Sequence, residues 1–596
     1  MRQNRKILKL LLFLPLFALV VSLFFFFSLN DSRQPDEVVI LYTNDIHTFI
    51  NNRVADNEKG AKSLSYSALA AIKNNLEKQG KEVILVDAGD HVQGTASGSV
   101  DKGETIIRLM NAAGYSLAVP GNHEFDYGMQ RFFELAKMAE FTYISADFYK
   151  IDDGKLILPP YKIIEKGGRK IAFVGISTPE SITKSTPTNF MDKSGKLLYN
   201  FYDSETHETL CGSLQNVIDS IRGGVDYIVA LGHLGVDISS MPYTSREIIA
   251  CTKGFDAFID GHSHTLIEHE YVRDAAGKNV LLTQTGAYFQ AAGKMTISKN
   301  GALSTEIIKE FPATDPKVEQ IEQEWIASLE QKFNEKIAVI DTEMFVMDPK
   351  NPEQRMIRNQ ETNLGDLSAD AYYYYFNEVL PLDCDIAFSN GGGIRNGIEK
   401  GAVSYLSVKN ILPFGNTICI VEATGQQIKD ALEKGVMFVG LWNTSKNIPA
   451  ESGSFQQVAG VAFEINAAVE SSVQVDKNRI WLGPPTGRYK VENIRVYNRK
   501  NRQYEPMDSE RNYRIAASDY TLKNFGGGMT MFKNSKIIKD FAGEDCEVMA
   551  DYLKAFKRGG DGFPHISTEN SPLKSYENYL LDYENPYGSG RIKIKK

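Results

Sequence analysis

The sequence predicts two α/β domains joined by a helix, and three observations carry this prediction. The chain has 596 residues, which is too long for a single hydrophobic core. From about residue 37 to residue 310, apolar strand-like runs alternate with helical stretches, as in a layered α/β fold. A long amphipathic stretch then separates this block from a second block of mixed strand and helix signals. We expect a four-layer sandwich for the first block and another α/β domain for the second.

The front end of the chain, residues 1–35, predicts a targeting segment outside the fold. A basic start precedes an apolar run over residues 10–29, which is just long enough to span a bilayer. The segment is a signal peptide or a signal anchor, and the lack of a small-residue cleavage site after it favours the uncleaved anchor. In both cases the remainder should face away from the cytoplasm. We therefore expect an exported protein, periplasmic or at the cell surface, with membrane anchoring through this run if it stays.

The first domain is predicted over residues 36–312. Its helical stretches lie at residues 68–80, 104–114, 129–140 and 213–224. Each lies between apolar runs that are short enough to be strands. Short loops between the two kinds of element favour a sheet covered by helices.

A linker helix is predicted over residues 313–337. Four apolar residues at four-residue spacing mark its buried stripe: Ile321, Trp325, Leu329 and Phe333. The second domain is predicted over residues 338–570. Residues 571–596 form a tyrosine-rich tail with a basic end, which we expect to be solvated.

Composition excludes one class of partner and leaves the disulfides open. The net charge of −9 argues against binding a nucleic-acid duplex, which needs a basic face. An acidic protein can still bind phosphate where metal ions and a few arginines make a site locally positive. The five cysteines are scattered. A Cys211–Cys251 disulfide is compatible with export but has no spacing signature, and the odd count leaves at least one thiol free.

The candidate site residues lie in five short patches, each directly after an apolar run. The patches hold five of the nine histidines and read Asp45-Ile46-His47, Gly89-Asp90, Gly121-Asn122-His123-Glu124-Phe125-Asp126, Gly232-His233 and Gly261-His262-Ser263-His264. In open α/β sheets, sites form at the carboxyl ends of the strands. Oxygen and imidazole ligands that meet there suit divalent metals such as Mn, Fe, Co, Ni or Zn. His91 lies outside this pattern and is read as an ordinary surface or packing residue, or as a support for the neighbouring Asp90.

Seven of these side chains are too many for one ion, and they fit two ions that share a carboxylate. Asp90 is the natural bridge because it is short and follows Gly89 at a strand end. One ion would take Asp45, His47 and His264, and the other would take Asn122, His233 and His262. Two such ions lower the pKa of a bound water and hold the oxygens of a phosphoryl group.

His123 and Asp126 are the candidate catalytic dyad. His123 follows Asn122 directly, so it cannot easily reach the same ion and is better placed to meet a phosphoryl oxygen. Asp126, three residues on, can accept from the other ring nitrogen and fix the tautomer. A helix or turn cap is the ordinary alternative for this aspartate.

Five motifs carry a specific resemblance: ILYTNDIH, VDAGDHVQG, GNHEFDYG, GHLG and DGHSH. They resemble the signatures of the calcineurin-like metallophosphatases, and within them of the 5′-nucleotidase family. The resemblance covers about residues 37 to 535. It implies a dimetal domain joined by a helix to a substrate-binding domain, with two divalent ions (Mn, Zn, Co, Fe or Mg) at the seven positions given above and the same dyad.

The second block supports the closer match. ETNLGDLSADA (361–371) resembles the opening of the family's second domain, FSNGGGIRNGI (388–398) resembles its substrate loop, and ILPFGN (411–416) resembles its base-stacking segment. The glycines allow close backbone approach, and an arginine can fork onto phosphate. An aromatic ring and an amide can stack on and pair with a base. The implied substrate-binding residues are Asn390, Arg395, Phe414, Asn416, Tyr520 and Arg358.

The chain departs from the family at one position. The family usually places an aspartate that binds ribose hydroxyls in a GGDGY-like loop after a second stacking aromatic. The matching stretch here is SDYTLKNFGGGMTMF (518–532), which offers Tyr520 or Phe525 as the aromatic and has Gly527 at the aspartate position. The GGDGF at 559–563 follows the expected terminal helix, so we read Asp561 as an accidental match.

These observations predict an exported, metal-dependent phosphomonoesterase that hydrolyses nucleoside 5′-phosphates. Other hydrolases on the same scaffold are the alternatives, namely a 2′,3′-cyclic nucleotide phosphodiesterase, a nucleotide-sugar hydrolase or a sulfur-ester hydrolase. A non-catalytic surface protein is a more distant alternative, since the ligand set and the dyad are complete. The expected partner is a nucleotide or another small phosphoester.

Overall fold

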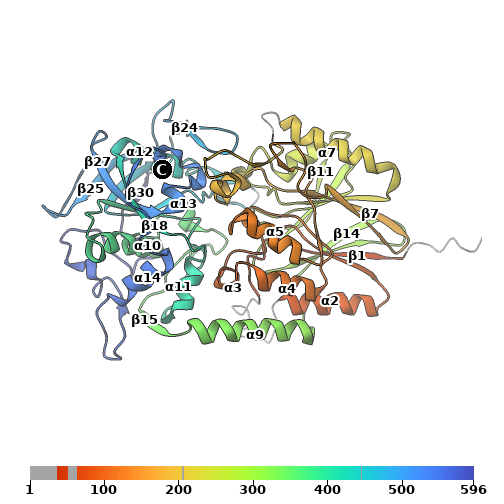
Figure 1. Cartoon of the computed structure of the whole chain (residues 1–596), viewed down its shortest axis with the longest axis horizontal. Coiled ribbons are helices and arrows are strands. Elements are labelled where there is room, and N and C mark those ends of the chain that lie inside the picture. The colour runs from red at the N-terminus through yellow and green to blue at the C-terminus, as the bar shows by residue number, and fades with distance from the viewer. Residues whose placement is uncertain (1–35, 51–63, 204–206, 445, 596) are drawn as a thin grey trace, which may run out of the picture.

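The computed structural model describes residues 36–50, 64–203, 207–444 and 446–595. The apolar run at residues 10–29 lies outside this part of the chain. Within the described ranges, no helix combines the length and the apolar character that a bilayer span needs. Two domains lie side by side, and the long helix α9 (Pro316–Phe333) runs beneath the first domain to the start of the second (Figure 1).

The first domain is built on two six-stranded sheets. One sheet has the order β14-β13-β1-β2-β3-β4, and its strands are β14 (Leu303–Ile308), β13 (Ala292–Ile297), β1 (Val38–Thr43), β2 (Glu82–Asp87), β3 (Leu117–Ala118) and β4 (Thr142–Tyr143). The other has the order β11-β12-β10-β9-β7-β6, and its strands are β11 (Leu266–Arg273), β12 (Asn279–Thr285), β10 (Ala257–Ile259), β9 (Tyr227–Gly232), β7 (Arg169–Ile176) and β6 (Tyr161–Lys166). The central strands of both sheets are parallel, so their carboxyl ends point to one edge.

The alternation of side chains along the strands produces the layers. In β1, Val39 and Leu41 pack under helices, whereas Val38, Ile40 and Tyr42 pack between the two sheets. Successive side chains of a strand point to opposite faces, so both faces of β1 are buried and its sequence is an unbroken apolar run. The predicted four-layer sandwich is therefore the fold of this domain.

Helices cover the outer faces of both sheets. They are α2 (Tyr66–Lys78), α4 (Glu104–Ala113) and α5 (Met129–Met138) on one side, and α7 (His207–Ile221) and α8 (Ser245–Cys251) on the other. A disulfide between Cys211 and Cys251, whose Cα atoms are 6.0 Å apart, ties α7 to α8. The sequence left this pairing open.

The linker helix α9 is fixed to the first domain by a buried carboxylate. Asp315 caps its first turn by accepting from the backbone N–H groups of Lys317 and Val318. Glu322 is buried and accepts hydrogen bonds from the backbone N–H and the hydroxyl of Ser67 in α2. At its other end, the Phe333 ring stacks on Tyr405 of the second domain, with a centroid distance of 6.0 Å.

The second domain is built on a five-stranded sheet with the order β21-β16-β27-β18-β28. Its strands are β21 (Gln456–Ala459), β16 (Ile386–Asn390), β27 (Asn512–Ser518), β18 (Ile418–Thr424) and β28 (Lys536–Lys539). Helices α10 (Asn363–Tyr374) and α14 (Asp545–Lys554) pack on one face, and α12 (Gly425–Gly435) packs on the other. β16 runs parallel to β27 and β18 runs antiparallel to it, so the end of β16 and the start of β18 share one edge.

Smaller sheets complete this domain. One contains β17 (Gly401–Ser404), β15 (Lys336–Ile340) and β29 (His565–Ile566), and another contains β26 (Gln503–Pro506), β25 (Val491–Asn498), β22 (Val461–Asn466) and β30 (Ile592–Lys595). Helix α11 (Tyr405–Ile411) lies between β17 and β18 along the chain.

The expectation that residues 571–596 form a solvated tail is wrong. The last strand, β30, pairs in parallel with β22. Arg591 is completely buried, its guanidinium donates to Asp370 at 2.8 Å, and it also donates to the carbonyl oxygens of Val458 and Leu580. The Asp370 carboxylate therefore balances the charge of Arg591, and Tyr579 and Tyr583 before it pack into the core, whereas Lys593 and Lys595 are exposed.

Substitution of Arg591 by Ala should destabilise the protein by about 3–5 kcal/mol, because it leaves the Asp370 carboxylate buried without its partner. Urea unfolding of the full chain measures this difference. Lys593→Ala is the matched control, since Lys593 lies two residues further on, in β30, and is exposed. Equal unfolding free energies for the two variants would contradict the assignment of a core role to Arg591.

Candidate metal centre and substrate cleft

Five loops bring the predicted ligands to one edge of the sandwich. Each loop follows a strand: Asp45 and His47 follow β1, Asp90 follows β2, Asn122 follows β3, His233 follows β9, and His262 and His264 follow β10. Three of these strands belong to one sheet and two belong to the other. The site therefore sits across the carboxyl ends of both sheets, as the sequence predicts.

The backbone of these loops is held in a conformation that side chains seldom adopt. The φ angle is 52° at Asp45, 50° at His47, 61° at Asp90, 76° at His262 and 54° at His264. Non-glycine residues in this left-handed region are uncommon, and clusters of them mark functional sites. The strain directs side chains from neighbouring loops into one small volume.

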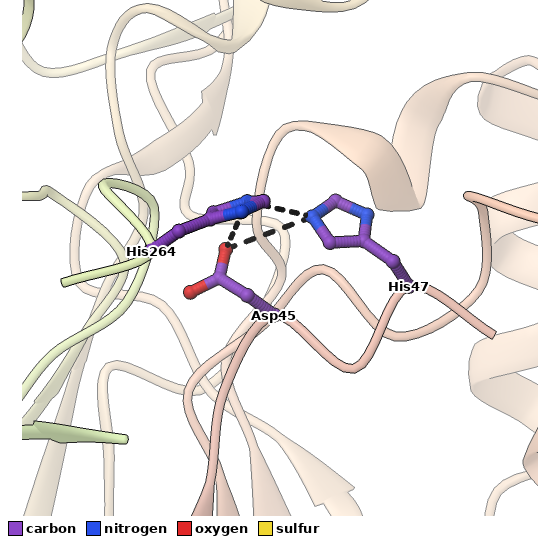
Figure 2. A group of neighbouring side chains, drawn as sticks. All are labelled: Asp45, His47 and His264. Carbon is purple, nitrogen blue, oxygen red and sulfur yellow. Dashed lines mark hydrogen bonds and ion pairs between the residues drawn. The ribbon is translucent and has the colours of Figure 1, made fainter. Parts of the chain in front are cut away.

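The first cluster consists of Asp45, His47 and His264, whose side chains point toward one another (Figure 2). His47 Nε2 lies 3.0 Å from His264 Nε2, and Asp45 Oδ1 lies 3.4 Å from His264 Nε2 and 3.8 Å from His47 Nε2. The other ring nitrogen of His47 faces the carbonyl oxygen of Gln93 at 2.9 Å. The Nε2 atoms are therefore the ones turned to the centre.

The second cluster consists of Asp90, His233 and His262. His233 Nε2 lies 3.1 Å from Asp90 Oδ2, while its Nδ1 faces the carbonyl oxygen of Ala88 at 2.6 Å. Asn122 lies beside this cluster, and its buried side-chain oxygen has no hydrogen-bond partner among the described residues. Asp90 also lies 3.8 Å from His47, so its carboxylate is close to both clusters.

The donor set fits divalent metal ions. Imidazole nitrogens, carboxylates and one amide oxygen are ligands of Mn, Fe, Co and Zn. Two facing imidazole nitrogens and an unpartnered buried amide oxygen would be unfavourable without a cation. Burial, reinforced by the Arg395 guanidinium, holds the pKa of His47 well below its usual value. Burial, reinforced by Arg355, does the same for the pKa of His264. Both are therefore neutral, the state that binds metal.

His123 and Asp126 form a hydrogen-bonded pair beside the clusters. His123 Nδ1 lies 2.5 Å from Asp126 Oδ2, and the Ser185 hydroxyl donates to the other Asp126 oxygen at 2.7 Å. The backbone N–H of His123 donates to Asp90 Oδ1 at 2.8 Å. His123 Nε2 is thus left for a ligand, and its ring centroid is 5.8 Å from that of Phe414 in the second domain.

A cleft lies between the domains and is lined by predicted residues from both of them. From the first domain it is lined by Asp90, Asn122, His123, Asp126, His262 and His264. From the second domain it is lined by Arg358, Asn390, Arg395, Phe414, Asn416 and Tyr520. Of the predicted site residues, Asp45, His47 and His233 are completely buried behind this lining.

The second-domain residues reach the cleft from one edge of their sheet. Asn390 ends β16, Phe414 and Asn416 precede β18, and Tyr520 follows β27 in the short helix α13 (Asp519–Leu522). Arg395 Nη2 lies 3.4 Å from His47 Nδ1 across the domain interface. Asn416 donates to Asp545 at 3.3 Å, which fixes the amide.

Comparisons with known proteins agree with this architecture. The chain matches the family described as "Calcineurin-like phosphoesterase" over residues 38–266, and the family described as "5'-nucleotidase, C-terminal domain" over residues 336–534. It is 26% identical to the 5′-nucleotidase of Bos taurus, with 88% of this chain and 90% of the relative covered. This chain belongs to the 5′-nucleotidase family. It is a hydrolase of phosphate esters.

Two further known proteins show how much of this chain is similar to others. The chain is 25% identical to the trifunctional nucleotide phosphoesterase protein YfkN of Bacillus subtilis, over 88% of this chain but only 35% of that much longer protein. The crystal structure of a 5′-nucleotidase precursor from Thermus thermophilus superposes with a TM-score of 0.71 and 24% identity, covering 94% of this chain and 99% of that one. The two-domain fold is therefore that of the 5′-nucleotidase family.

Several residues of this family member were not predicted from the sequence. Glu124 accepts hydrogen bonds from the backbone N–H groups of Asp90, His91 and Gly121, at 2.8, 2.8 and 2.6 Å. Its carboxylate thus organises the loop that carries Asp90. The sequence feature that could have identified Glu124 is its place within the GNHEFDYG motif.

Two other buried groups touch the predicted residues. Glu180 lies 3.1 Å from His262 Nε2 and leaves His262 Nδ1 for the centre. Arg355 pairs with Glu451 at 2.8 Å and lines the cleft beside Arg358. Burial, together with Arg355 and Arg395, lowers the pKa of Arg358 to about 9. His91 hydrogen-bonds to Asp87 and Tyr143, which agrees with its reading as a packing residue.

Gly527, at the position of the family's aspartate, lies against Ser454. Gly527 has φ +60°, and a Cβ atom there would lie 2.4 Å from the Ser454 hydroxyl oxygen. Tyr520 lines the cleft at this point, whereas Phe525 is not among the lining residues. Asp561 lies in an exposed turn, paired with Lys336 and His565, and does not contribute to the cleft.

Proposed function

We propose that the chain is an exported, metal-dependent phosphomonoesterase that hydrolyses nucleoside 5′-phosphates to nucleoside and phosphate. One observation carries the proposal: a single cleft is lined by four of the predicted metal ligands and the dyad of the first domain, and by an aromatic ring, an amide and arginines of the second domain. A nucleotide has the matching parts, since its phosphate is anionic and its base offers a ring face and polar edges.

Two divalent ions are proposed, one held by Asp45, His47 and His264 and the other by Asn122, His233 and His262, with Asp90 shared. When bound, such ions lower the pKa of a water molecule and polarise the phosphoryl group. Asp90 belongs to the second cluster and lies 3.8 Å from His47 of the first, and His47 and Asp90 also group with His123, which supports a carboxylate shared between the two ions. The donor set does not distinguish Mn, Zn, Co, Fe and Mg from one another.

His123 is proposed to donate a hydrogen bond from Nε2 to a phosphoryl oxygen as negative charge develops there. Asp126 accepts from the opposite nitrogen, and Ser185 fixes Asp126, so the imidazole is held in one orientation before the substrate arrives. Such preorganised donors are worth about 10²–10³-fold in turnover.

The second domain is proposed to bind the remainder of the nucleotide. Phe414 is half-buried and its ring faces the cleft, so a base can stack on it. Asn416 presents its amide to the base edge, and Asn390 and Tyr520 line the same space. Arg358 and Arg395 are proposed to bind phosphate oxygens. Arg358 Nε is buried without a partner among the described residues, which suits a donor that awaits a ligand.

Export is proposed on two observations. The basic start and the apolar run over residues 10–29 have the form of a signal peptide or signal anchor. The disulfide Cys211–Cys251 belongs to proteins of oxidising compartments. Fractionation of cells that express the full chain tests this: recovery of the protein in the cytosolic fraction would contradict export.

A substrate panel tests the central activity. The purified full chain is assayed with nucleoside 5′-mono- and diphosphates, 2′,3′-cyclic nucleotides and nucleotide sugars, each with Mn, Co, Zn and Mg, and released phosphate is measured. Nucleoside 5′-monophosphates should be hydrolysed only in the presence of a divalent metal. Hydrolysis of cyclic nucleotides or nucleotide sugars alone would replace the proposed activity with one of these alternatives.

Asp90→Asn and His123→Ala should separate the metal centre from the dyad. Asp90→Asn removes the shared carboxylate, so both activity and bound metal should be lost. His123→Ala should retain its metal and lose about 10²–10³-fold in turnover, the effect of one missing charge-stabilising donor. Elemental analysis and steady-state kinetics measure the two effects. Loss of metal from the His123 variant would show that His123 is a ligand instead.

Phe414→Ala should lower kcat/KM for a nucleoside monophosphate by about five- to a hundred-fold, because stacking on an aromatic ring is worth about 1–3 kcal/mol per base. Hydrolysis of a small aryl phosphate should change far less, since that substrate places no base on this ring. Kinetics with both substrates provide the comparison. An equal loss on both would make Phe414 a structural residue, and no loss on either would remove it from the binding site.

A further inference from the structure

One end of the cleft, beside Gly527, is lined by three cations. Lys184 ends the short helix α6 (Ser181–Lys184), Lys434 lies in the last turn of α12, and Arg479 precedes β24 (Trp481–Gly483). All three line the cleft together with Gly527. We call these four residues the Lys434 subsite. Such a cluster is unexpected in a chain whose net charge is −9.

The positive charges of the subsite are poorly balanced. Lys434 is 2% exposed, and its ammonium group donates to the carbonyl oxygen of Gly527, a neutral partner. Arg479 donates to the carbonyl oxygen of Met241 at 2.8 Å. Neither cation forms an ion pair with a carboxylate in the part of the chain that the structure describes, and Asp476 favours the charged form of Lys434 only from beyond ion-pair distance. Burial, together with Lys184 and Arg479, lowers the pKa of Lys434 to about 7.

The Glu180 carboxylate, which pairs with Lys184, also has another partner. Lys184 Nζ lies 3.8 Å from Glu180 Oε1, and Glu180 Oε2 lies 3.1 Å from His262. Glu180 thus connects Lys184 of the subsite to His262, a proposed metal ligand. An acidic side chain at Gly527 would require the Ser454 hydroxyl to move, because that hydroxyl lies 2.4 Å from the place of a Cβ atom.

A nucleoside monophosphate does not account for these cations. Its one anionic group is assigned to the metal centre and to Arg358 and Arg395, and a ribose with free hydroxyls needs no buried cations around it. Burying a charge without a partner is costly, so an unbalanced cluster at a cleft wall suits a site whose counter-charge arrives with the ligand.

We propose that the Lys434 subsite binds a second phosphoryl group of the substrate, so that the preferred substrates are nucleotides with two phosphates. The inference rests on the proposed nucleotide hydrolysis and specifies its substrate class. The second phosphate has two sources with the same chemistry: a phosphate on a ribose hydroxyl, as in a nucleoside 3′,5′-bisphosphate, or the second phosphate of a nucleoside 5′-diphosphate. Lys434 and Arg479 donate to its oxygens, and Lys184 adds charge from the first domain.

Kinetics of the full chain with a divalent metal test the proposal. The substrates are adenosine 5′-monophosphate, adenosine 3′,5′-bisphosphate and adenosine 5′-diphosphate. At least one of the doubly phosphorylated substrates should exceed the monophosphate in kcat/KM on the order of tenfold, the usual gain from hydrogen bonds to a charged group. Whichever one does so identifies the source of the second phosphate.

Lys434→Met should reduce this preference toward unity, because it removes the buried cation and keeps the length of the side chain. Arg479→Gln is a second variant at a less buried position, and it should reduce the preference in the same direction if Lys434→Met does not fold. Lys429→Met is the matched control. Lys429 lies on the same helix, outside the cleft lining, with its ammonium 3.9 Å from the centroid of the Tyr489 ring. It should leave the preference intact.

The outcomes separate this proposal from the one on which it rests. Equal kcat/KM for all three substrates, or a preference that survives both Lys434→Met and Arg479→Gln, would overturn the subsite while leaving nucleotide hydrolysis in place. Failure to hydrolyse any of the three nucleotides would overturn the proposed function itself, and the subsite with it.

Discussion

The metal centre depends on one tight turn, in which Gly89 and Asp90 leave β2 in left-handed conformations. The Asp90 carboxylate lies 3.1 Å from His233 and 3.8 Å from His47, so the two clusters meet at this side chain. Glu124 fixes the backbone of the turn, and a Cβ atom on Gly121 would lie 2.3 Å from an Asp90 oxygen. Buried carboxylates need positive charge nearby. We therefore infer that the turn and the metal depend on each other: the turn places the Asp90 carboxylate, and bound metal balances its charge.

The cleft exists because the site edges of two sheets face each other. The first-domain edge presents the clusters and His123, and the second-domain edge presents Arg395 and Phe414, with Arg395 only 3.4 Å from His47. A substrate that touches both edges would hold the domains together and exclude water from its phosphate. Interfaces of this kind within a chain commonly permit relative motion, so binding and closure are expected to be coupled.

The sequence predicted the site best where the candidate residues lie in short patches directly after strands. The order of β-rich runs and polar ends predicted which side chains meet at the sandwich edge, because strand ends deliver side chains to one place. Contacts between distant segments could not be predicted in this way. Glu180 reaches His262 from 82 residues away, and Arg591 finds Asp370 at a separation of 221 residues. The burial of Arg591 at the end of the chain was missed for this reason, although the lysines that follow it are exposed.

The central claim is that two metal ions, joined through Asp90, form the reacting centre of this cleft. The most direct measurement is a titration of the metal-free full chain with Mn²⁺ or Co²⁺, in which bound ions per chain and hydrolysis of a nucleoside 5′-monophosphate are followed together. The account predicts two bound ions per chain and full activity only when the second has bound. Full activity with a single bound ion, or with none, would contradict it.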